Sequence, residues 1–441
     1  MALGSQVSGL EAITDLTGLV HEIYAGEVKP NVSAWSPTSQ LFQQAGSGDY
    51  RIDGEKLVFS ADLTYAGGAQ GTDGNLPDHQ YVDAVEGQTT PARLYVRRAI
   101  DNFIEKRAQK GPGAFGDLLG RMFDQMWDAF GRAQIRHAVG TSTGTLCKVS
   151  SRTSSTVFVV KDGYGHASTP PLMHLEVGMI IGWVDVNDSN TVAGAATITA
   201  ITYSTNTVTV TTAATWEPGN DVAANDLIVM ATTPNIATDY FTSEYTNAPN
   251  GLMNIVDPDS DASTVFNIAE GTYPRWKPYR KASSSFDHIE VTEHFRKLRA
   301  KSTSPVGPST HVCVAQGAVV AELARTLVGF QQQTQLGRTF EGGYQAVRIA
   351  NMDFIEDDWQ LHDVLYTLSV EDLFTVDLDG EADYFAEDGS QFSRLADFDG
   401  KEWYVKSYMQ SFSDRRNRHA ALTGISLANV TAADFSPTPD Y

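Results

Sequence analysis

The part of this chain that most limits its fold is a glycine-dense segment between Ala45 and Gly87. Within it, only residues 56–65 alternate apolar and polar side chains as a β-strand does. The segment carries too few apolar residues to form a core of its own. Because a connection of this length is unusual inside a compact domain, we predict a long, extended hairpin that packs against something else.

A helix is predicted directly after this hairpin. Thr90 and Pro91 are typical of an N-cap followed by a first helical residue. An apolar stripe with helical spacing follows at Val96, Ile100, Phe103 and Ile104. The stretch is also rich in Arg and Lys, which we interpret as a solvated face rather than a phosphate site.

Residues 111–116 match the letters of a dinucleotide-binding loop, GxGxxG. That motif requires a buried strand directly before it, and the preceding segment is the charged helix just described. We therefore interpret the glycines as a flexible break between two helices. Residues 117–139 then show the strongest helical periodicity of the chain, with bulky apolar residues at three- and four-residue steps, and predict a long structural helix.

Composition changes sharply near Cys147. From there to residue 232 the chain is rich in Thr, Val, Ile and Ala, and turn residues separate its short apolar runs. This pattern predicts a small all-β sandwich or barrel inserted between helical regions. His166 and His174 lie in it without a third candidate ligand, so we expect isolated surface or loop histidines rather than a metal site.

Beyond residue 233 the pattern returns to mixed α and β structure. Helices are predicted at 291–300 and 316–328, and strands at 311–314, 345–350, 364–368, 404–412 and 418–426. We expect the last two strands to form a hairpin around a turn at 413–418.

The chain contains 32 Lys and Arg against 54 Asp and Glu, a formal charge of −22. This acidity opposes wrapping a nucleic acid, because phosphate binding depends on Lys and Arg. No apolar run approaches the roughly 18 residues of a membrane helix, and we expect no secretory signal because no basic stretch and apolar block open the sequence. With Cys147 and Cys313 as its two cysteines, the chain has neither a disulfide framework nor CxxC-type zinc sites.

No catalytic motif supports an enzyme. Residues 257–261 resemble the start of a calcium loop, but Ala262 and Ile268 occupy the positions that require Gly and Glu. The acidic stretch 353–399 offers carboxylates for a hydrolase, yet nothing selects a catalytic pair. Cys313 lies in an apolar strand and suits a buried small residue better than a nucleophile. We therefore expect no catalytic residue, no metal and no cofactor.

Three basic clusters contrast with the acidic background. They are Arg275, Lys277, Arg280 and Lys281; Arg296, Lys297, Arg299 and Lys301; and Arg415, Arg416 and Arg418. Contacts with acidic surfaces of neighbouring copies are favoured over contacts with enclosed phosphates. The simpler alternative is a set of exposed ion pairs, each worth under about 1 kcal/mol.

The order of these elements resembles the major capsid protein of tailed bacteriophages, whose HK97-like fold is shared with encapsulin shells. An arm, a glycine-rich extended hairpin and a long helix precede a mixed α/β region and a closing hairpin. Residues 341–375 carry the resemblance most clearly, with a glycine-rich loop, a strand running into acidic residues, a short turn and then Leu365-Tyr366-Thr367-Leu368. The resemblance implies an α+β, HK97-like capsid fold.

The resemblance also implies six parts along the chain. These are an N-terminal arm (1–35), an extended loop with the following helix (36–110), a spine helix region (111–146), an inserted all-β domain (147–232), an axial domain (233–375), and peripheral-domain strands with a C-terminal tail (376–441). The inserted domain is a departure, because the basic capsid fold does not need it. The Lys and Asn partners that cross-link subunits in part of the family are not matched here.

By resemblance, the expected function is self-assembly of hexamers and pentamers into an icosahedral shell around the double-stranded DNA of a tailed phage. The protein would be made in the host cytoplasm and reside in the virion, without contacting a membrane. Its expected partners are a portal, a separate scaffolding protein, a decoration protein as a further candidate, and packaged DNA through non-specific contacts. Gly67 and Gly68 would let the hairpin bend between conformers.

Three alternatives remain open at this point. The first is an encapsulin-type nanocompartment shell, which has the same fold. The second is a phage tail or adhesion protein whose β domain binds glycans, with Trp183 and Trp216 stacking on sugars. The third is an acid/base hydrolase that uses the acidic stretch.

Overall fold

The computed structural model describes residues 36–62, 84–101, 112–185, 191–211, 224–231, 244–257, 264–302, 306–328, 347–378 and 393–427, without positions 47, 308, 350–351 and 395–398. The chain divides into two compact units. The first comprises Met1–Gln40, Arg93–Ile135 and Asp377–Tyr408; the second comprises Leu41–Ala92, Arg136–Val376 and Met409–Tyr441.

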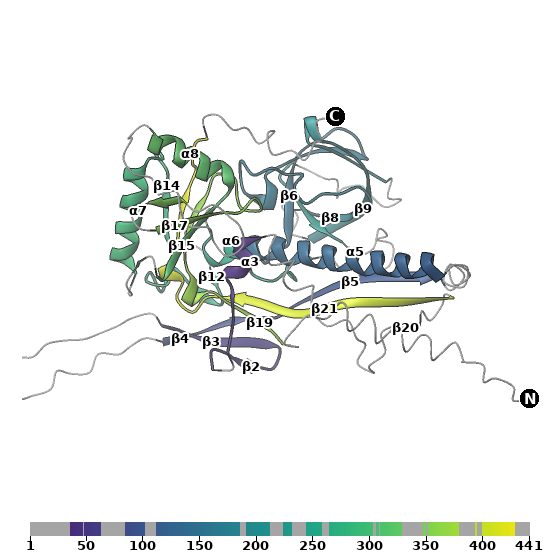
Figure 1. The fold of residues 1–441 in the computed structure, drawn as a ribbon, viewed down its shortest axis with the longest axis horizontal. Helices are drawn as coiled ribbons and strands as arrows, with labels where there is room; N and C mark the ends of the chain where they lie inside the picture. Colours follow the sequence, from purple (N-terminus) through teal and green to yellow (C-terminus); the bar gives the residue numbers. More distant parts are fainter. Residues whose placement is uncertain are drawn as a thin grey trace, which may run out of the picture. The chain divides into compact units, whose positions relative to one another are not determined.

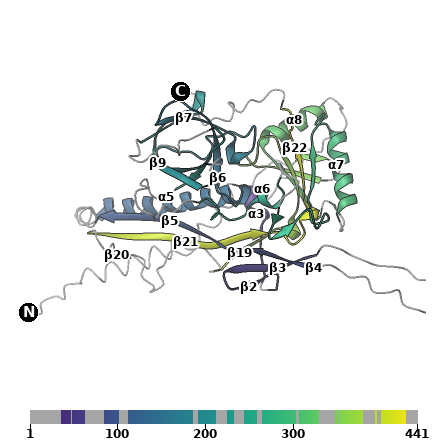
Figure 2. The same ribbon diagram turned by 180° about the vertical axis from the view of Figure 1, so that it is seen from behind.

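The first unit contains most of one long helix and of two long strands. They are α5 (Pro112–Val139), β5 (Ala92–Asp101) and β21 (Gly400–Phe412), whose residues 136–139, 92 and 409–412 belong to the second unit. Strand β5 pairs with β21, and the rings of Tyr95 and Tyr408 meet edge to face, with their hydroxyl oxygens 3.2 Å apart. Both views show α5 running alongside this pair of strands (Figures 1 and 2).

The helix predicted after residue 90 is wrong, because residues 92–101 form strand β5. Ala92 and Leu94 are buried whereas Arg93 and Tyr95 are exposed, which is the alternation of a strand. Pairing with β21 stabilises a strand with this alternation. The contact with β21 therefore outweighs the local preference for a helix.

The flexible break predicted at residues 111–116 is also wrong, because α5 already begins at Pro112. The glycines at positions 113 and 116 therefore lie inside the helix. Proline is favoured in the first turn of a helix because the amide it lacks would have no helical partner there. In the part of α5 whose side chains are described, Met126 and Phe130 are buried, as the predicted apolar stripe requires.

The glycine-dense segment forms a hairpin within a three-stranded sheet. Its strands are β2 (Arg51–Asp53), β3 (Lys56–Asp62) and β4 (Ala84–Thr89), with β3 in the middle and antiparallel to both neighbours. Leu57, Phe59 and Ala61 are buried, as the alternating pattern predicts. Gly67 and Gly68 lie between β3 and β4, outside the described residues.

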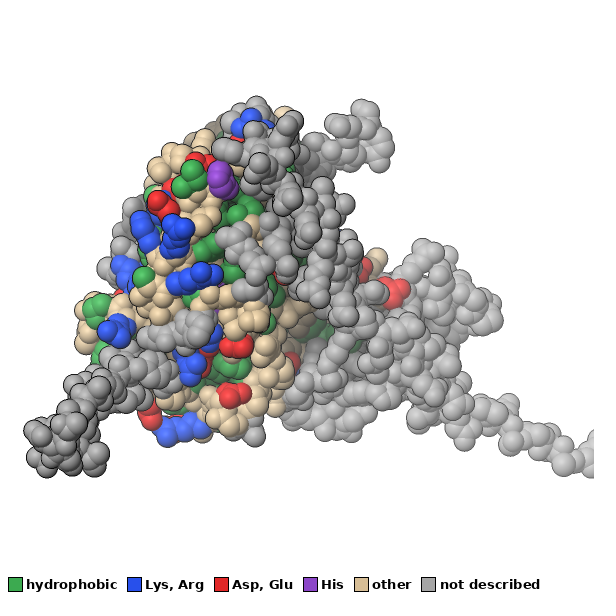
Figure 3. All heavy atoms as spheres, turned by 60° about the vertical axis from the view of Figure 1, so that its left-hand side comes forward, with side chains coloured by type: hydrophobic (Ala, Val, Ile, Leu, Met, Phe, Trp, Pro, Cys, Tyr) green, Lys and Arg blue, Asp and Glu red, His purple; other side chains and the backbone are tan. Residues whose placement is uncertain are grey.

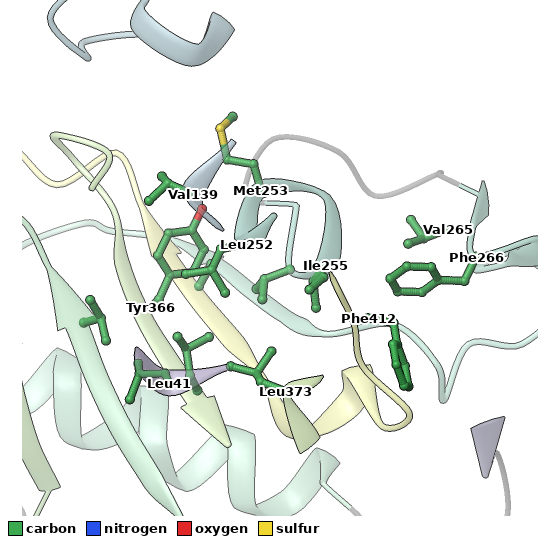
Figure 4. Packing of buried hydrophobic residues seen from close by; sticks show 14 of the residues in the cluster. Leu41, Val139, Leu252, Met253, Ile255, Val265, Phe266, Tyr366, Leu373 and Phe412 are labelled. Atoms are coloured by element: carbon green, nitrogen blue, oxygen red, sulfur yellow. The ribbon is translucent and has the colours of Figure 1, made fainter. Parts of the chain in front are cut away.

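The base of this hairpin is anchored in a core of the second unit. The ring of Phe59 stacks on that of Phe412 at 4.5 Å between centroids, and meets Phe266 edge to face at 5.3 Å. Figure 4 shows Phe266 and Phe412 in the same apolar cluster as the residues of helix α6 (Leu252–Ile255). The base of the hairpin therefore packs against a core of its own chain.

The region of short apolar runs closes into a barrel of six strands, in the order β10-β7-β6-β11-β8-β9. Their bounds are Thr145–Arg152 (β6), Val157–Lys161 (β7), Ile180–Asp185 (β8), Thr191–Thr202 (β9), Thr207–Val210 (β10) and Leu227–Met230 (β11). All neighbouring strands are antiparallel. Phe158, Trp183 and Val208 fill its interior and are buried.

A six-stranded mixed sheet organises the rest of the second unit, in the order β14-β22-β18-β15-β17-β16. Its bounds are Tyr279–Ala282 (β14), His311–Ala315 (β15), Val347–Ile349 (β16), Met352–Glu356 (β17), Leu365–Ser369 (β18) and Ala420–Thr423 (β22). Cys313 and Ala315 face one apolar core, while Val314 between them faces the core that holds Phe59.

Two helices cover the first of these faces. Helices α7 (His288–Lys301) and α8 (Gly317–Val328) bury apolar residues in one cluster with Cys313 and Ala315. Both helices and the strands at 311–314, 345–350 and 364–368 were predicted from the pattern, and the described residues confirm them to within a few positions. The apolar pattern of each of these elements is complete within one short segment. Local sequence patterning is therefore enough to predict them.

The predicted closing hairpin is wrong. Strand β21 pairs with β5, with β20 (Ser393–Arg394) and with β19 (Phe374–Asp377), whereas β22 pairs with β14 and β18 in the other sheet. The residues between them form a buried 3-10 helix, η4 (Arg416–Arg418), instead of a hairpin turn. The physical reason lies in the two arginines of η4, which reach buried carboxylates described below.

Gly87 tests how firmly the hairpin base is fixed. A Cβ added at this position would lie 2.4 Å from Cζ of Phe59, and that ring is held between Phe266 and Phe412. We expect Gly87→Ala to lower the free energy of unfolding by about 1–3 kcal/mol, the usual cost of overpacking, measured by urea denaturation.

Gly271→Ala is the matched control, because no atom lies within 4 Å of the Cβ it would add. It should change the free energy of unfolding by less than about 0.5 kcal/mol. Equal stability of the two variants would show that the Phe59 ring is not held in place.

Candidate functional site

A buried carboxylate gathers two of the arginines singled out in the sequence. The side chain of Glu270 has 0% exposure. Arg280 donates to its two oxygens at 3.1 and 3.2 Å, and Nη1 of Arg416 donates at 2.9 Å. Nε of Arg416 donates to the carbonyl of Ile255, and its guanidinium carbon lies 5.7 Å from the ring centroid of Trp276. Buried charges of this kind must be paired.

Three separate segments bring this network together. Glu270 follows the tight hairpin of β12 (Thr264–Val265) and β13 (Ile268–Ala269), Arg280 lies on β14, and Arg416 lies on η4. The hairpin turn places Phe266 and Asn267 at φ values of 54° and 64°. Burial lowers the pKa of Arg416 to about 10 against the opposing effect of Glu270, which leaves the guanidinium charged at neutral pH.

The other arginine of η4 is paired in the same way. Nη1 of Arg418 lies 2.6 Å from a carboxylate oxygen of Asp372, and both side chains are buried. Arg416 and Arg418 are therefore internal supports of η4, and intersubunit contacts predicted for them would have to break buried ion pairs.

Lys281 reaches a further buried carboxylate. Its Nζ lies 2.6 Å from Oε1 of Glu290, which also accepts from backbone amides of residues 284–286. Asp287, the N-cap of α7, accepts from the amide of Glu290 at 2.7 Å. Although burial opposes it, the hydrogen bonds from Lys281, Ser283 and the backbone hold the pKa of Glu290 well below its usual range.

The remaining interface candidates differ in exposure. Arg275 is exposed, while Lys277 and Arg415 are half-buried. Gly67 and Gly68 lie outside the described residues. Of the first and third basic clusters, Arg275 is thus the member that is fully accessible, and these clusters do not form a shared cationic surface.

The second basic cluster does form one. Arg296, Lys297 and Arg299 are exposed on the C-terminal half of α7, and we call this surface the cationic face of α7. Figure 3, in which the left-hand side of Figure 1 comes forward, shows several Lys and Arg side chains on this side of the molecule, with Asp and Glu side chains between some of them. Neither Arg296 nor Lys297 forms an ion pair with a carboxylate in the described part of the chain.

The acidic stretch between residues 353 and 399 supplies structural contacts where it is described. Asp372 holds Arg418, Asp363 lies 2.6 Å from His166, and Asp377 accepts from the hydroxyl of Ser407. Cys313 is buried beside Thr367, and burial raises its pKa to about 12. Asp363, Asp372, Asp377 and Cys313 therefore make contacts within the fold.

The histidines of the β region lie in loops, as predicted, but they are not isolated. His166 is buried and contacts Asp363, and the ring of His174 stacks on Trp359 at 5.6 Å between centroids. Thr169 accepts from the amide of His362 nearby. These histidines therefore fasten the barrel to loops of the six-stranded sheet, a role that depends on tertiary contacts and has no local signal.

The glycan-binding alternative loses one of its two tryptophans. Trp183 is buried in the barrel core with 1% exposure, so its ring is not available for stacking on a sugar. Trp216 lies outside the described residues.

The sequence analysis did not identify the two buried carboxylates Glu270 and Glu290 as structural residues. Glu290 had a detectable signal, because Asp287 three positions before it completes the pattern of a capping box. Glu270 had none, since its two arginine partners lie 10 and 146 positions away in the sequence.

No group of three or more His, Cys, Asp and Glu side chains within the described ranges is arranged to hold a metal ion. Among the helices with described residues, none combines the length and hydropathy needed to cross a membrane.

Comparison with known proteins finds similar solved structures. No family model matches the chain, and no curated protein matches it. A capsid protein of cyanophage A-1(L) is similar over 90% of this chain and 92% of its own, with 11% identity and a TM-score of 0.49. A protein of the satellite phage P4 procapsid is similar over 96% and 98%, with 8% identity and a TM-score of 0.41. An encapsulin from Synechococcus elongatus is similar over 36% of this chain and 55% of its own, with 12% identity and a TM-score of 0.27.

Glu270→Gln tests the network at its centre. Removing the charge leaves Arg280 and Arg416 buried without their carboxylate, so we expect the free energy of unfolding to fall by about 3–5 kcal/mol, measured by urea denaturation. Glu86→Gln is the control, because Glu86 pairs with Arg51 at the surface with both side chains more than half exposed. It should cost less than about 1 kcal/mol, and a similar small loss for both variants would contradict the buried network.

Buried histidines predict acid sensitivity. Burial lowers the pKa of His294 to about 3 and that of His311 to about 4, so the unfolded chain binds protons at a higher pH than the folded one. Stability is then complete above pH 6.5 and is lost as pH falls toward these values. From pH 7 to pH 5, each histidine should cost about 2 kcal/mol.

The check is the difference in unfolding free energy between pH 7 and pH 5 at low protein concentration. His294→Leu should reduce this difference by about 2 kcal/mol, whatever its effect on absolute stability. An unchanged pH dependence in the variant would mean that His294 titrates alike in the folded and unfolded chains.

Proposed function

We propose that this chain is a major capsid protein, which self-assembles into a closed shell. In this proposal its role is structural, with no catalytic step. The finer form of the proposal is an icosahedral shell of hexamers and pentamers that encloses the double-stranded DNA of a tailed phage, with the chain located in the virion after synthesis in the host cytoplasm.

The observation that carries the proposal is the β2–β3–β4 sheet. Its inner face is fixed in the core through Phe59, whereas all three residues of the edge strand β2 are exposed, including Ile52 at 59%. A strand edge of this kind offers unpaired backbone groups and apolar surface to another chain. Because the sheet is anchored in the core and its edge strand β2 is exposed, a strand or loop of a neighbouring copy can pair with it or pack on it.

The proposal assigns parts of the chain to parts of the shell protein. The hairpin would be the extended loop, α5 the spine, the six-stranded sheet with α7 and α8 the axial domain, and β21 a peripheral-domain strand. The barrel would be a domain inserted into this plan. Gly67 and Gly68 would allow the hairpin to bend between shell positions.

The same proposal implies partners that a shell of this class needs. A portal would fill one vertex, a separate scaffolding protein would guide assembly, and a decoration protein is a further candidate. The shell protein would contact packaged DNA without recognising its base sequence. Arg275 is exposed, and Lys277 and Arg415 are half-buried, so these predicted interface cations are candidates for contacts in the shell.

Sedimentation velocity of the purified full chain tests this function. Because assembly repeats one set of contacts many times, we expect a cooperative rise of one large species with concentration, and little material between monomer or capsomer and that species. Dissociation in high salt would follow from the charged contacts. A single slow species at all concentrations would contradict the proposal.

A further inference from the structure

The cationic face of α7 is tied firmly to one edge of the six-stranded sheet. Lys281 of the edge strand β14 binds Glu290 of the helix, and Nζ of Lys301 donates to the carbonyl of Pro278 at 2.9 Å. The ring of His294 packs against that of Tyr279, with 5.1 Å between the two ring centroids. Arg296 and Lys297 are therefore presented to solvent on a rigid support.

A small acidic surface lies toward the other edge of the same sheet. Glu356 ends strand β17, which is the neighbour of edge strand β16, and Asp358 follows it at an exposed position. Burial and the charge of Asp358 raise the pKa of Glu356. The two carboxylates thus repel each other, and no ion pair within the described ranges relieves them.

These two surfaces are complementary in charge and belong to the same compact unit. A surface that fits a different surface on an identical copy makes a head-to-tail contact, which closes into a ring when the rotation between copies allows it. A contact of this kind would place a cation of one copy beside carboxylates that repel each other in the next copy.

We propose that the cationic face of α7 binds the acidic surface of Glu356 and Asp358 on a second copy of this chain. This inference rests on the proposed shell function and names one contact within a ring of subunits. It assigns Lys297 and Arg296 the role of setting which neighbour is accepted, since like-charge contacts cost several kcal/mol while opposite charges steer association.

The composition of the face favours a protein partner over a nucleic acid. The exposed surface of α7 also includes Ile289, 55% exposed, and the carboxylate of Glu293. A phosphate backbone would gain nothing from Ile289 and would be repelled by Glu293. The chain's formal charge of −22 means that other copies offer this face an excess of carboxylates.

Charge reversal with rescue tests the contact. Lys297→Glu and Asp358→Lys each place like charges opposite one another, and each should lower the assembled fraction of the full chain by about tenfold or more, measured by sedimentation velocity. The double variant Lys297→Glu/Asp358→Lys restores opposite charges and should assemble nearly as well as the unaltered chain. Lys161→Glu on the barrel is the charge-matched control and should assemble normally.

The outcomes separate this contact from the proposed function. Failure of the unaltered chain to assemble would overturn both. Assembly of the unaltered chain and of both single variants would overturn the contact alone, as would a double variant that assembles no better than the single ones. Loss of co-purifying DNA in Lys297→Glu, with assembly unchanged, would show that the face binds a nucleic acid instead.

A zero-length cross-link gives a second readout on the unaltered chain. A carbodiimide activates a carboxylate, and the amine of Lys297 then displaces the activating group to form an amide. In an assembled mixture of isotope-labelled and unlabelled chains, we expect Lys297 joined to Glu356 or Asp358 in peptides that combine both labels. Products confined to a single label would contradict a contact between copies.

Discussion

The described fold depends on the pairing of Glu270 with Arg280 and Arg416 in a dry interior. A carboxylate with no exposed surface is tolerated only when its charge is matched, and here three distant segments supply the match. The network fixes η4 against the β12–β13 hairpin and so determines where β21 ends and β22 begins. Phe412, which leads into this region, also carries the stacked ring of Phe59. The buried ion pairs that hold η4 thus lie next in the chain to the aromatic contacts that anchor the hairpin.

Sequence patterning predicted the elements whose signal is complete within one segment. Helices α7 and α8, strands β15 and β18 and the β-rich region all have apolar stripes or alternations that need no distant partner. Patterning gave the wrong result where a distant strand determines the local structure. Residues 92–101 are a strand because β21 lies beside them, and β22 leaves β21 because β14 and β18 offer it a place in the other sheet.

The same division applies to the candidate site. The basic clusters were visible in the sequence, but composition does not say whether an arginine faces solvent or a buried carboxylate. Arg416 and Arg418 were predicted at an interface and lie inside ion pairs, whereas Arg296 and Lys297 remain exposed. Charge that is already neutralised within the fold stabilises the subunit, and charge that is left over is available for association. In an acidic chain, an unneutralised cationic helix face is therefore the more informative feature.

If single copies are subunits of a closed particle, electron microscopy of the purified full chain at high concentration should show hollow particles of uniform diameter, built from rings of subunits. A field of separate, compact monomers under conditions in which the chain is folded would contradict it.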